Sequence, residues 1–145
     1  MSCKSLSFLI GTAALLLATS ARTASSQAMP SVWDGIYTVD QAQRGKEQYQ
    51  KSCSACHGPN MEGQGMAAAL SGETFRTSWS GKSVFDLIIR IQTTMPQDDP
   101  GSLSAAASRD IVAFVIQTNG FPAGTSEIMA DSAALKRITI SREKP

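Results

Sequence analysis

Residues 53–57 of this 145-residue chain read Cys-Ser-Ala-Cys-His. Two thiols separated by two residues can each form a thioether with one of the two vinyl groups on a haem edge. The histidine that follows is then held beneath the iron as an axial ligand. His57 is the only histidine in the sequence. The motif therefore predicts one covalently bound haem c, attached through Cys53 and Cys56, with His57 as a ligand of the iron.

Other uses of a Cys-x-x-Cys pair fit the sequence less well. A structural zinc site needs four Cys or His ligands, whereas only three remain once Cys3 leaves with the leader described below. A thioredoxin-like redox pair follows a buried strand, but the segment before Cys53 has helical periodicity. A disulfide across two residues would be strained and would leave His57 without a role.

The first 28 residues have the layout of a secretory signal peptide. Lys4 precedes a short apolar run, and small polar residues follow up to Ala28. We expect cleavage after Ala28, with Ser20 or Ala21 as alternative cleavage positions. The apolar run is short for a bilayer, so we expect no membrane span in the mature protein, although a retained anchor is the alternative. Because c-type haem is generally attached outside the cytoplasmic membrane, leader and motif together predict a periplasmic protein.

The remaining residues, 29–145, are expected to form one mono-haem domain with a C-terminal tail. The chain has 13 Lys and Arg against 12 Asp and Glu, and residues 1–28 hold two of the basic residues and none of the acidic ones, so the mature net charge is −1. No basic run is present, so nothing indicates nucleic acid as a partner. A domain of this size has a thin core, which a large apolar cofactor would supplement.

Three segments carry apolar residues at helical spacing, which predicts helices over 39–54, 84–93 and 105–118. Thr38 and Gln41 have the spacing of a capping box at the start of the first helix. The chain is therefore expected to be all-α, with three main helices.

The segments between and after these helices have weaker patterns. Many turn-forming residues between 58 and 81 predict a loop that covers one haem face, with one short turn over 66–70. In this loop Phe75 is expected in the core, and Arg76 and Trp79 are candidate partners of a haem propionate. A short helical turn is expected over 132–138.

Gly45 lies in the middle of the first predicted helix, where glycine costs about 1 kcal/mol relative to alanine. A second helix that crosses too closely to leave room for a Cβ would justify this cost. We therefore expect a helix crossing at Gly45.

The sixth ligand of the iron cannot be a second histidine of this chain. Met, Lys, water or no ligand remain as alternatives. Met95 follows a predicted helix and precedes Pro96, which holds its backbone extended. It lies far enough along the chain from His57 to reach the opposite haem face. Met95 is therefore the expected ligand, ahead of the other methionines outside the leader, which are Met29, Met61, Met66 and Met129.

Ligation by His57 and Met95 would fill both axial positions. The soft thioether favours the reduced iron, and no substrate could bind the metal. This predicts an electron carrier that is not itself an enzyme. The alternative is a haem enzyme, or a protein that binds a gas or peroxide, with a labile sixth ligand. That alternative requires Met95 to dissociate, and the chain offers no second histidine as an acid–base group.

These residues resemble the class I cytochromes c over most of Thr38–Asn119. Members of that family place a glycine and an aromatic residue on the first helix, as Gly45 and Tyr49 do here. They cross it with a C-terminal helix that carries an aliphatic and an aromatic contact, which Ile111 and Phe114 match. The resemblance implies an all-α class I cytochrome c fold, in which three main helices surround one covalent haem.

A narrower likeness concerns the segments 95–96, 100–104 and 121–124. They resemble small periplasmic cytochromes that accompany quinoprotein alcohol dehydrogenases. This implies redox-protein partners, namely a quinoprotein or similar dehydrogenase as donor, and a terminal oxidase or another cytochrome as acceptor. The chain would act as a carrier or as the cytochrome subunit of a dehydrogenase complex.

The chain departs from the family at Ala68. Many class I cytochromes have a proline in this loop, and its carbonyl accepts the ring N–H of the axial histidine. An alanine carbonyl can serve equally, but the stiffness that proline gives to the loop would then be missing.

Overall fold

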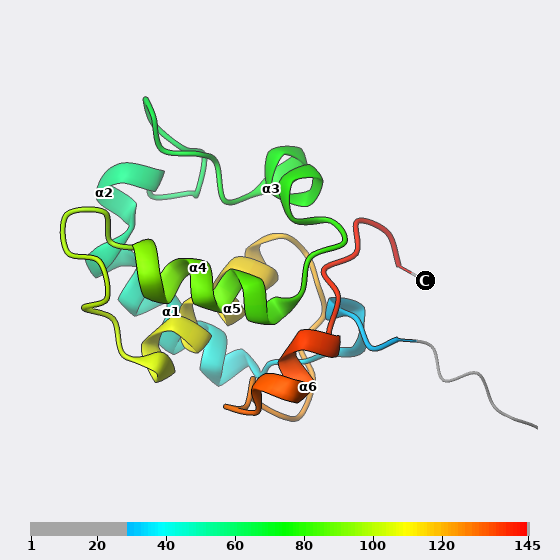
Figure 1. The fold of residues 1–145 in the computed structure, drawn as a ribbon. Helices are drawn as coiled ribbons and strands as arrows, with labels where there is room; N and C mark the ends of the chain where they lie inside the picture. The colour runs from blue at the N-terminus through cyan, green and yellow to red at the C-terminus, as the bar shows by residue number, and fades with distance from the viewer. Residues whose placement is uncertain (1–28, 145) are drawn as a thin grey trace, which may run out of the picture.

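The computed structural model describes residues 29–144, so the expected signal peptide and its cleavage site lie outside the described residues. The elements in chain order (Figure 1) are η1 (Val32–Asp34), α1 (Val39–Ser52), α2 (Ser54–His57), α3 (Gly72–Trp79), α4 (Val84–Thr94), α5 (Ala105–Thr118) and α6 (Ser132–Arg137). Within this part of the chain there are isolated β-bridges but no strands. The predicted all-α class is confirmed. Among the described helices, none has the length and apolar character needed to cross a membrane.

The predicted crossing at Gly45 is confirmed, because α1 lies directly against α5. A Cβ built on Gly45 would lie 1.8 Å from the carbonyl oxygen of Asp110 and 3.0 Å from the Cβ of Phe114. One turn further along α1, the ring of Tyr49 meets the ring of Phe114 edge to face, with centroids 5.6 Å apart. Residues of both helices are fully buried at this contact, including Ile111. The crossing is therefore the centre of the core.

The three predicted helices begin where their caps indicate. The hydroxyls of Thr38, Ser83 and Ser104 each accept a hydrogen bond from a backbone N–H in the first turn of the helix that follows. At α4 the capping box with Asp86 is complete, and its hydrogen bonds to Ser83 lower the pKa of the Asp86 carboxyl. At α1 only half of the expected box forms. The side chain of Gln41 turns instead to Ile128, whose N–H donates to Gln41 Oε1 at 2.8 Å.

The expectation of a loop over the whole of 58–81 is wrong, because α3 lies within it. Phe75 and Trp79 are one helical turn apart and stack with centroids 6.3 Å apart, and Phe75 is fully buried. Two apolar residues are too few to show a periodicity in the sequence, and a glycine opens the helix. The short turn also lies earlier than expected, at Gln64–Ala67, where the Ala67 N–H donates to Gln64 O at 2.9 Å.

The C-terminal tail joins segments that are far apart in the sequence. The expected helical turn over 132–138 forms as α6, which packs against α4, with Lys136 Nζ 4.7 Å from the ring centroid of Phe85. Thr139 then exchanges backbone hydrogen bonds with the N-terminal segment, donating to Pro30 O at 2.9 Å and accepting from Val32 N at 3.0 Å. Figure 1 shows this segment rising from α6 beside the start of α4. The tail thereby joins the N-terminal segment to the start of α4, where Val84 N donates to Ile138 O at 2.9 Å.

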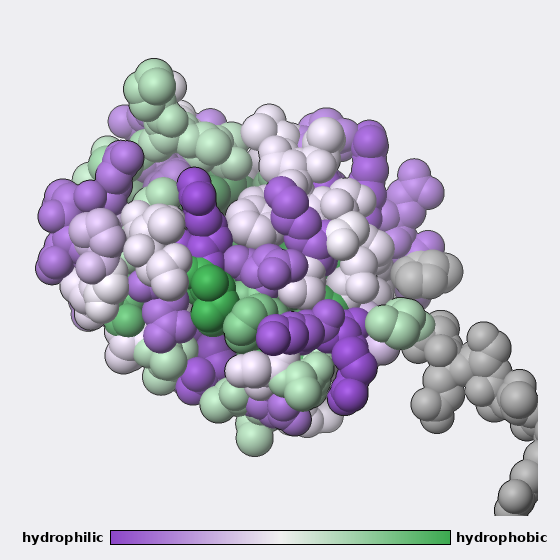
Figure 2. Space-filling model, in the orientation of Figure 1, coloured by the Kyte–Doolittle hydropathy of each residue, from purple (hydrophilic) through white to green (hydrophobic). Residues whose placement is uncertain are grey.

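The loop between α2 and α3 projects from the molecule (Figure 1), and Figure 2 shows its tip in pale green, an apolar surface. Met66 in this loop is fully exposed. Nothing lies within 4 Å of a Cβ built on Gly65. The tip therefore takes no support from the core.

Replacing Gly45 with alanine should lower the free energy of unfolding by about 3 kcal/mol, because the new Cβ meets backbone that cannot move aside. Denaturant unfolding measures the change. Gly65→Ala is the matched control. Its φ of +55° disfavours a side chain but nothing crowds it, so the expected cost is about 1 kcal/mol. Equal costs at the two positions would contradict the close crossing.

Candidate haem-binding site

The Cys-x-x-Cys-His motif lies where α1 ends and α2 begins. Cys53 interrupts the helix with φ −128° and ψ −35°, and α2 then holds the remaining motif residues in a single turn. Both thiols are free; Cys53 is half-buried and Cys56 is exposed. Burial, with a smaller contribution from the charge of Cys56, raises the pKa of Cys53 to about 11. The structure thus presents two unpaired thiols in one turn, as thioether attachment requires.

The half-buried ring of His57 is oriented by a backbone carbonyl. Its Nδ1–H donates to Ala68 O at 2.8 Å. A carbonyl can only accept, so this contact sets the tautomer and leaves Nε2 with a free lone pair. The resemblance implied that the Ala68 carbonyl would accept this ring N–H, and the hydrogen bond is present.

Tyr49 holds the backbone that directly follows the motif. Its buried hydroxyl donates to Gly58 O at 2.6 Å, directly after His57. Burial raises the pKa of Tyr49 to about 12, and the negative charges of Cys53 and Glu62 add to the effect. The sequence indicated Tyr49 only as a helix contact. Its second role depends on a polar atom at the far end of an aromatic side chain, which no spacing pattern shows.

Met95 ends α4 in the extended conformation that Pro96 predicted, with φ −127° and ψ 148°. It is half-buried. Among the methionines of residues 29–144, Met61 is 1% exposed and packed in the core, whereas the other three are well exposed. Met95 is thus more exposed than the core residue Met61 and less exposed than the other three methionines.

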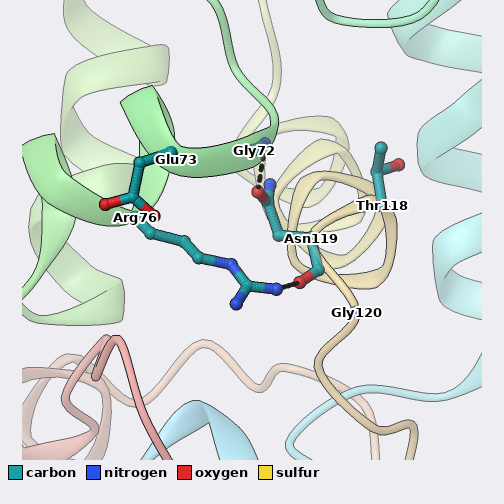
Figure 3. A pocket seen from close by; sticks show the side chains of 6 residues that line it. All are labelled: Gly72, Glu73, Arg76, Thr118, Asn119 and Gly120. Carbon is teal, nitrogen blue, oxygen red and sulfur yellow. Dashed lines mark hydrogen bonds between the residues drawn. The ribbon is translucent and has the colours of Figure 1, made fainter.

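Arg76 and Trp79, the candidate propionate partners, both have contacts within the protein. Arg76 Nη2 donates to Asn119 O at 2.6 Å (Figure 3). Trp79 stacks on the ring of Phe75, and the ammonium of Lys82 lies 4.9 Å from its ring centroid. Arg76 borders a shallow hollow of about 340 Å³, lined by Gly72, Glu73, Arg76, Thr118, Asn119 and Gly120. None of the four predicted haem residues lines this hollow.

The residues at the motif fit a haem c. They supply two free thiols, an imidazole with one nitrogen anchored and the other available, and a half-buried thioether on a separate element. A zinc site fits less well, because no cluster of three or more His, Cys, Asp or Glu within residues 29–144 could hold a metal ion. The thiols would hold the haem, and His57 and Met95 are the candidate iron ligands.

Replacing Tyr49 with phenylalanine leaves the buried Gly58 carbonyl without its donor. We expect the free energy of unfolding to fall by about 1–3 kcal/mol and the haem absorption bands to shift. Tyr37→Phe is the matched control, because Tyr37 also donates a buried hydroxyl, to Phe121 O at 2.7 Å, away from the motif. That variant should lose similar stability and keep the wild-type spectrum. A wild-type spectrum in both variants would contradict the role of Tyr49 at the site.

The chain was compared with known protein families and solved structures. The family model described as "Cytochrome C oxidase, cbb3-type, subunit III" matches residues 40–115. Among solved structures, the sulfane dehydrogenase SoxCD from Paracoccus pantotrophus is similar, with 18% sequence identity, a TM-score of 0.49, and coverage of 90% of this chain and 67% of that chain. No curated protein sequence matches the chain. The family match spans more than half of the sequence and contains the whole motif, so the chain belongs to this family and is a class I c-type cytochrome that carries haem c.

Proposed function

We propose that this cytochrome is a periplasmic carrier of single electrons. Cys53 and Cys56 attach the haem, and His57 and Met95 are the axial ligands of its iron. When bound, the haem supplies a one-electron couple. The observation that best supports this proposal is the 2.8 Å hydrogen bond from His57 Nδ1 to Ala68 O, because it leaves Nε2 as the coordinating atom.

The protein's part in this function is to hold the two ligands in both oxidation states. The Ala68 carbonyl makes the imidazole of His57 a stronger donor. The Met95 thioether, presented in an extended segment after α4, favours the reduced state. Two protein ligands leave no position for a substrate at the iron. This supports electron transfer through the haem edge and a non-catalytic role.

The location and the partners follow from other observations. The leader expected over 1–28 would deliver the chain to the periplasm, where cytochromes c mature. The family's description as a subunit of cytochrome c oxidase supports a terminal oxidase as acceptor, and another cytochrome is the alternative. The resemblance of the segments around 95–104 and 121–124 supports a quinoprotein dehydrogenase as donor, with this chain as its carrier or its cytochrome subunit.

Replacing Met95 with alanine should convert the haem from low-spin to high-spin, because it removes the sulfur ligand. Absorption spectra of the oxidised and dithionite-reduced protein, matured with its leader in a host that attaches haem c, measure the change. The weak long-wavelength sulfur–iron band should disappear in Met95→Ala and persist in the control Met66→Ala, whose side chain is fully exposed. If the wild type is already high-spin and binds carbon monoxide at once, the sixth position is open, and the enzyme or gas-binding alternative is correct.

A purified quinoprotein alcohol dehydrogenase with its substrate should reduce the ferric cytochrome at a rate that saturates with cytochrome concentration. The polypeptide has an expected mature charge of −1, to which the two haem propionates add. The total stays small, so electrostatic steering should be weak. The rate measured by stopped flow should therefore change little between about 0.01 M and 0.15 M ionic strength. Reduction by small-molecule reductants alone, with none by the dehydrogenase, would exclude this class of donor.

A further inference from the structure

We infer that Asn119 is a positioning residue for the axial histidine. It holds the segment that carries the Ala68 carbonyl and thereby sets the strength of the hydrogen bond to His57. This inference rests on the proposed ligation of the iron by His57.

Asn119 is buried at the end of α5, with 3% of its surface exposed. Its side-chain amide accepts from Gly72 N at 3.0 Å and donates to Leu70 O at 2.9 Å and to Val115 O at 2.8 Å. Figure 3 shows the amide turned toward the Gly72 N–H at the start of α3. One side chain thus ties residues 70–72 to the C-terminal end of α5.

Residues 70 and 71 are in turn hydrogen-bonded to Met61, in the part of the loop that leaves α2. Leu70 N donates to Met61 O at 2.9 Å, and the Ser71 hydroxyl donates to the same oxygen at 3.2 Å. Met61 is fully buried. The backbone that Asn119 holds is therefore continuous with a fixed point in the core.

Ala68 lies two residues before Leu70, inside this closed loop. A Cβ built on Gly63 would lie 2.7 Å from both Ala67 O and Ala69 N, so the two halves of the loop are in direct contact around Ala68. Gly63 N also donates to His57 O at 2.8 Å. The position of the Ala68 carbonyl thus depends on residues 70–72 on one side and on the histidine's own backbone on the other.

The backbone of residue 68 gains no stiffness from its own side chain, so the support from Asn119 adds to the few hydrogen bonds within the loop. Alanine at 68 does not restrict its own φ as proline would. The tip of the loop is exposed, with Met66 fully accessible and open space around Gly65. Asn119 supplies from α5 the rigidity that the loop sequence lacks.

The consequence is chemical as well as structural. A well-placed carbonyl strengthens the Nδ1–H hydrogen bond and makes Nε2 of His57 a better donor, which stabilises the oxidised iron. If residues 70–72 are released, the carbonyl becomes less well placed and the hydrogen bond weakens. The ferrous form is then more stable relative to the ferric form, and the reduction potential rises.

The test uses the haem-loaded protein with Asn119→Leu, which has a similar volume and no amide. The ratio of ferrous to ferric protein at a fixed ambient potential should rise by up to about tenfold, which equals about 59 mV for one electron. In the ferrous protein the ring Nδ1–H of His57 should exchange faster with water by NMR, and the signal is unambiguous because the chain has one histidine. If Asn119→Leu does not mature, Asn119→Asp keeps an acceptor for Gly72 N and removes both donated bonds. Because its carboxylate would itself lower the potential, the readout for this variant is the Nδ1–H exchange alone, which should again be faster than in the wild type.

Ile128→Ala is the control for loss of stability alone. Ile128 is buried, and its backbone bonds to Gln41 at the opposite end of α1 from the motif. It should lower the free energy of unfolding and leave both readouts unchanged. If the Asn119 variants lose only stability, with wild-type potential and Nδ1–H exchange, the inference is wrong while the proposed function stands. A wild-type haem that lacks histidine ligation would instead overturn the proposed ligation, and the inference with it.

Discussion

The rest of the fold depends on the contact between α1 and α5, where a Cβ on Gly45 would lie 1.8 Å from the backbone of Asp110. Backbones this close leave the two helices a single arrangement, which the edge-to-face pair of Tyr49 and Phe114 extends by one more turn. The crossing also fixes the two helix ends that matter for the site. The haem motif begins where α1 ends, and Asn119 caps the end of α5.

The surroundings of the candidate histidine are built mainly from hydrogen bonds to backbone carbonyls. Tyr49 holds Gly58 O, His57 holds Ala68 O, and Asn119 holds Leu70 O. The chain between α2 and α3 has little regular structure, so without these side chains its carbonyls would lack fixed positions. The tip of this loop is exposed, but both of its ends are hydrogen-bonded to core side chains. The Ala68 carbonyl can therefore still have a defined position.

The success of sequence-based prediction differed between segments for physical reasons. The helix over 105–118 was predicted to the residue, because Ser104 caps it and Gly120, with φ +81°, lies just beyond its end. The helix at 72–79 was missed, because its two large apolar residues, Phe75 and Trp79, are too few to show a periodicity, and the support from Asn119 is a tertiary contact. The capping box at Thr38 formed only in part. The Gln41 side chain accepts from the buried backbone N–H of Ile128 instead of from the backbone N–H of the N-cap residue.

The amino-acid sequence alone was sufficient for the features that depend on neighbours in the chain. Two thiols and an imidazole within five residues define the attachment chemistry, apolar periodicity defines the main helices, and the costly Gly45 indicates a close crossing. The tertiary structure alone decided what holds the carbonyl that orients His57, and where the tail packs. These contacts join residues such as Asn119 and Leu70, 49 positions apart. A hydrogen bond at that separation leaves no local pattern, because it forms only when folding brings the two segments together.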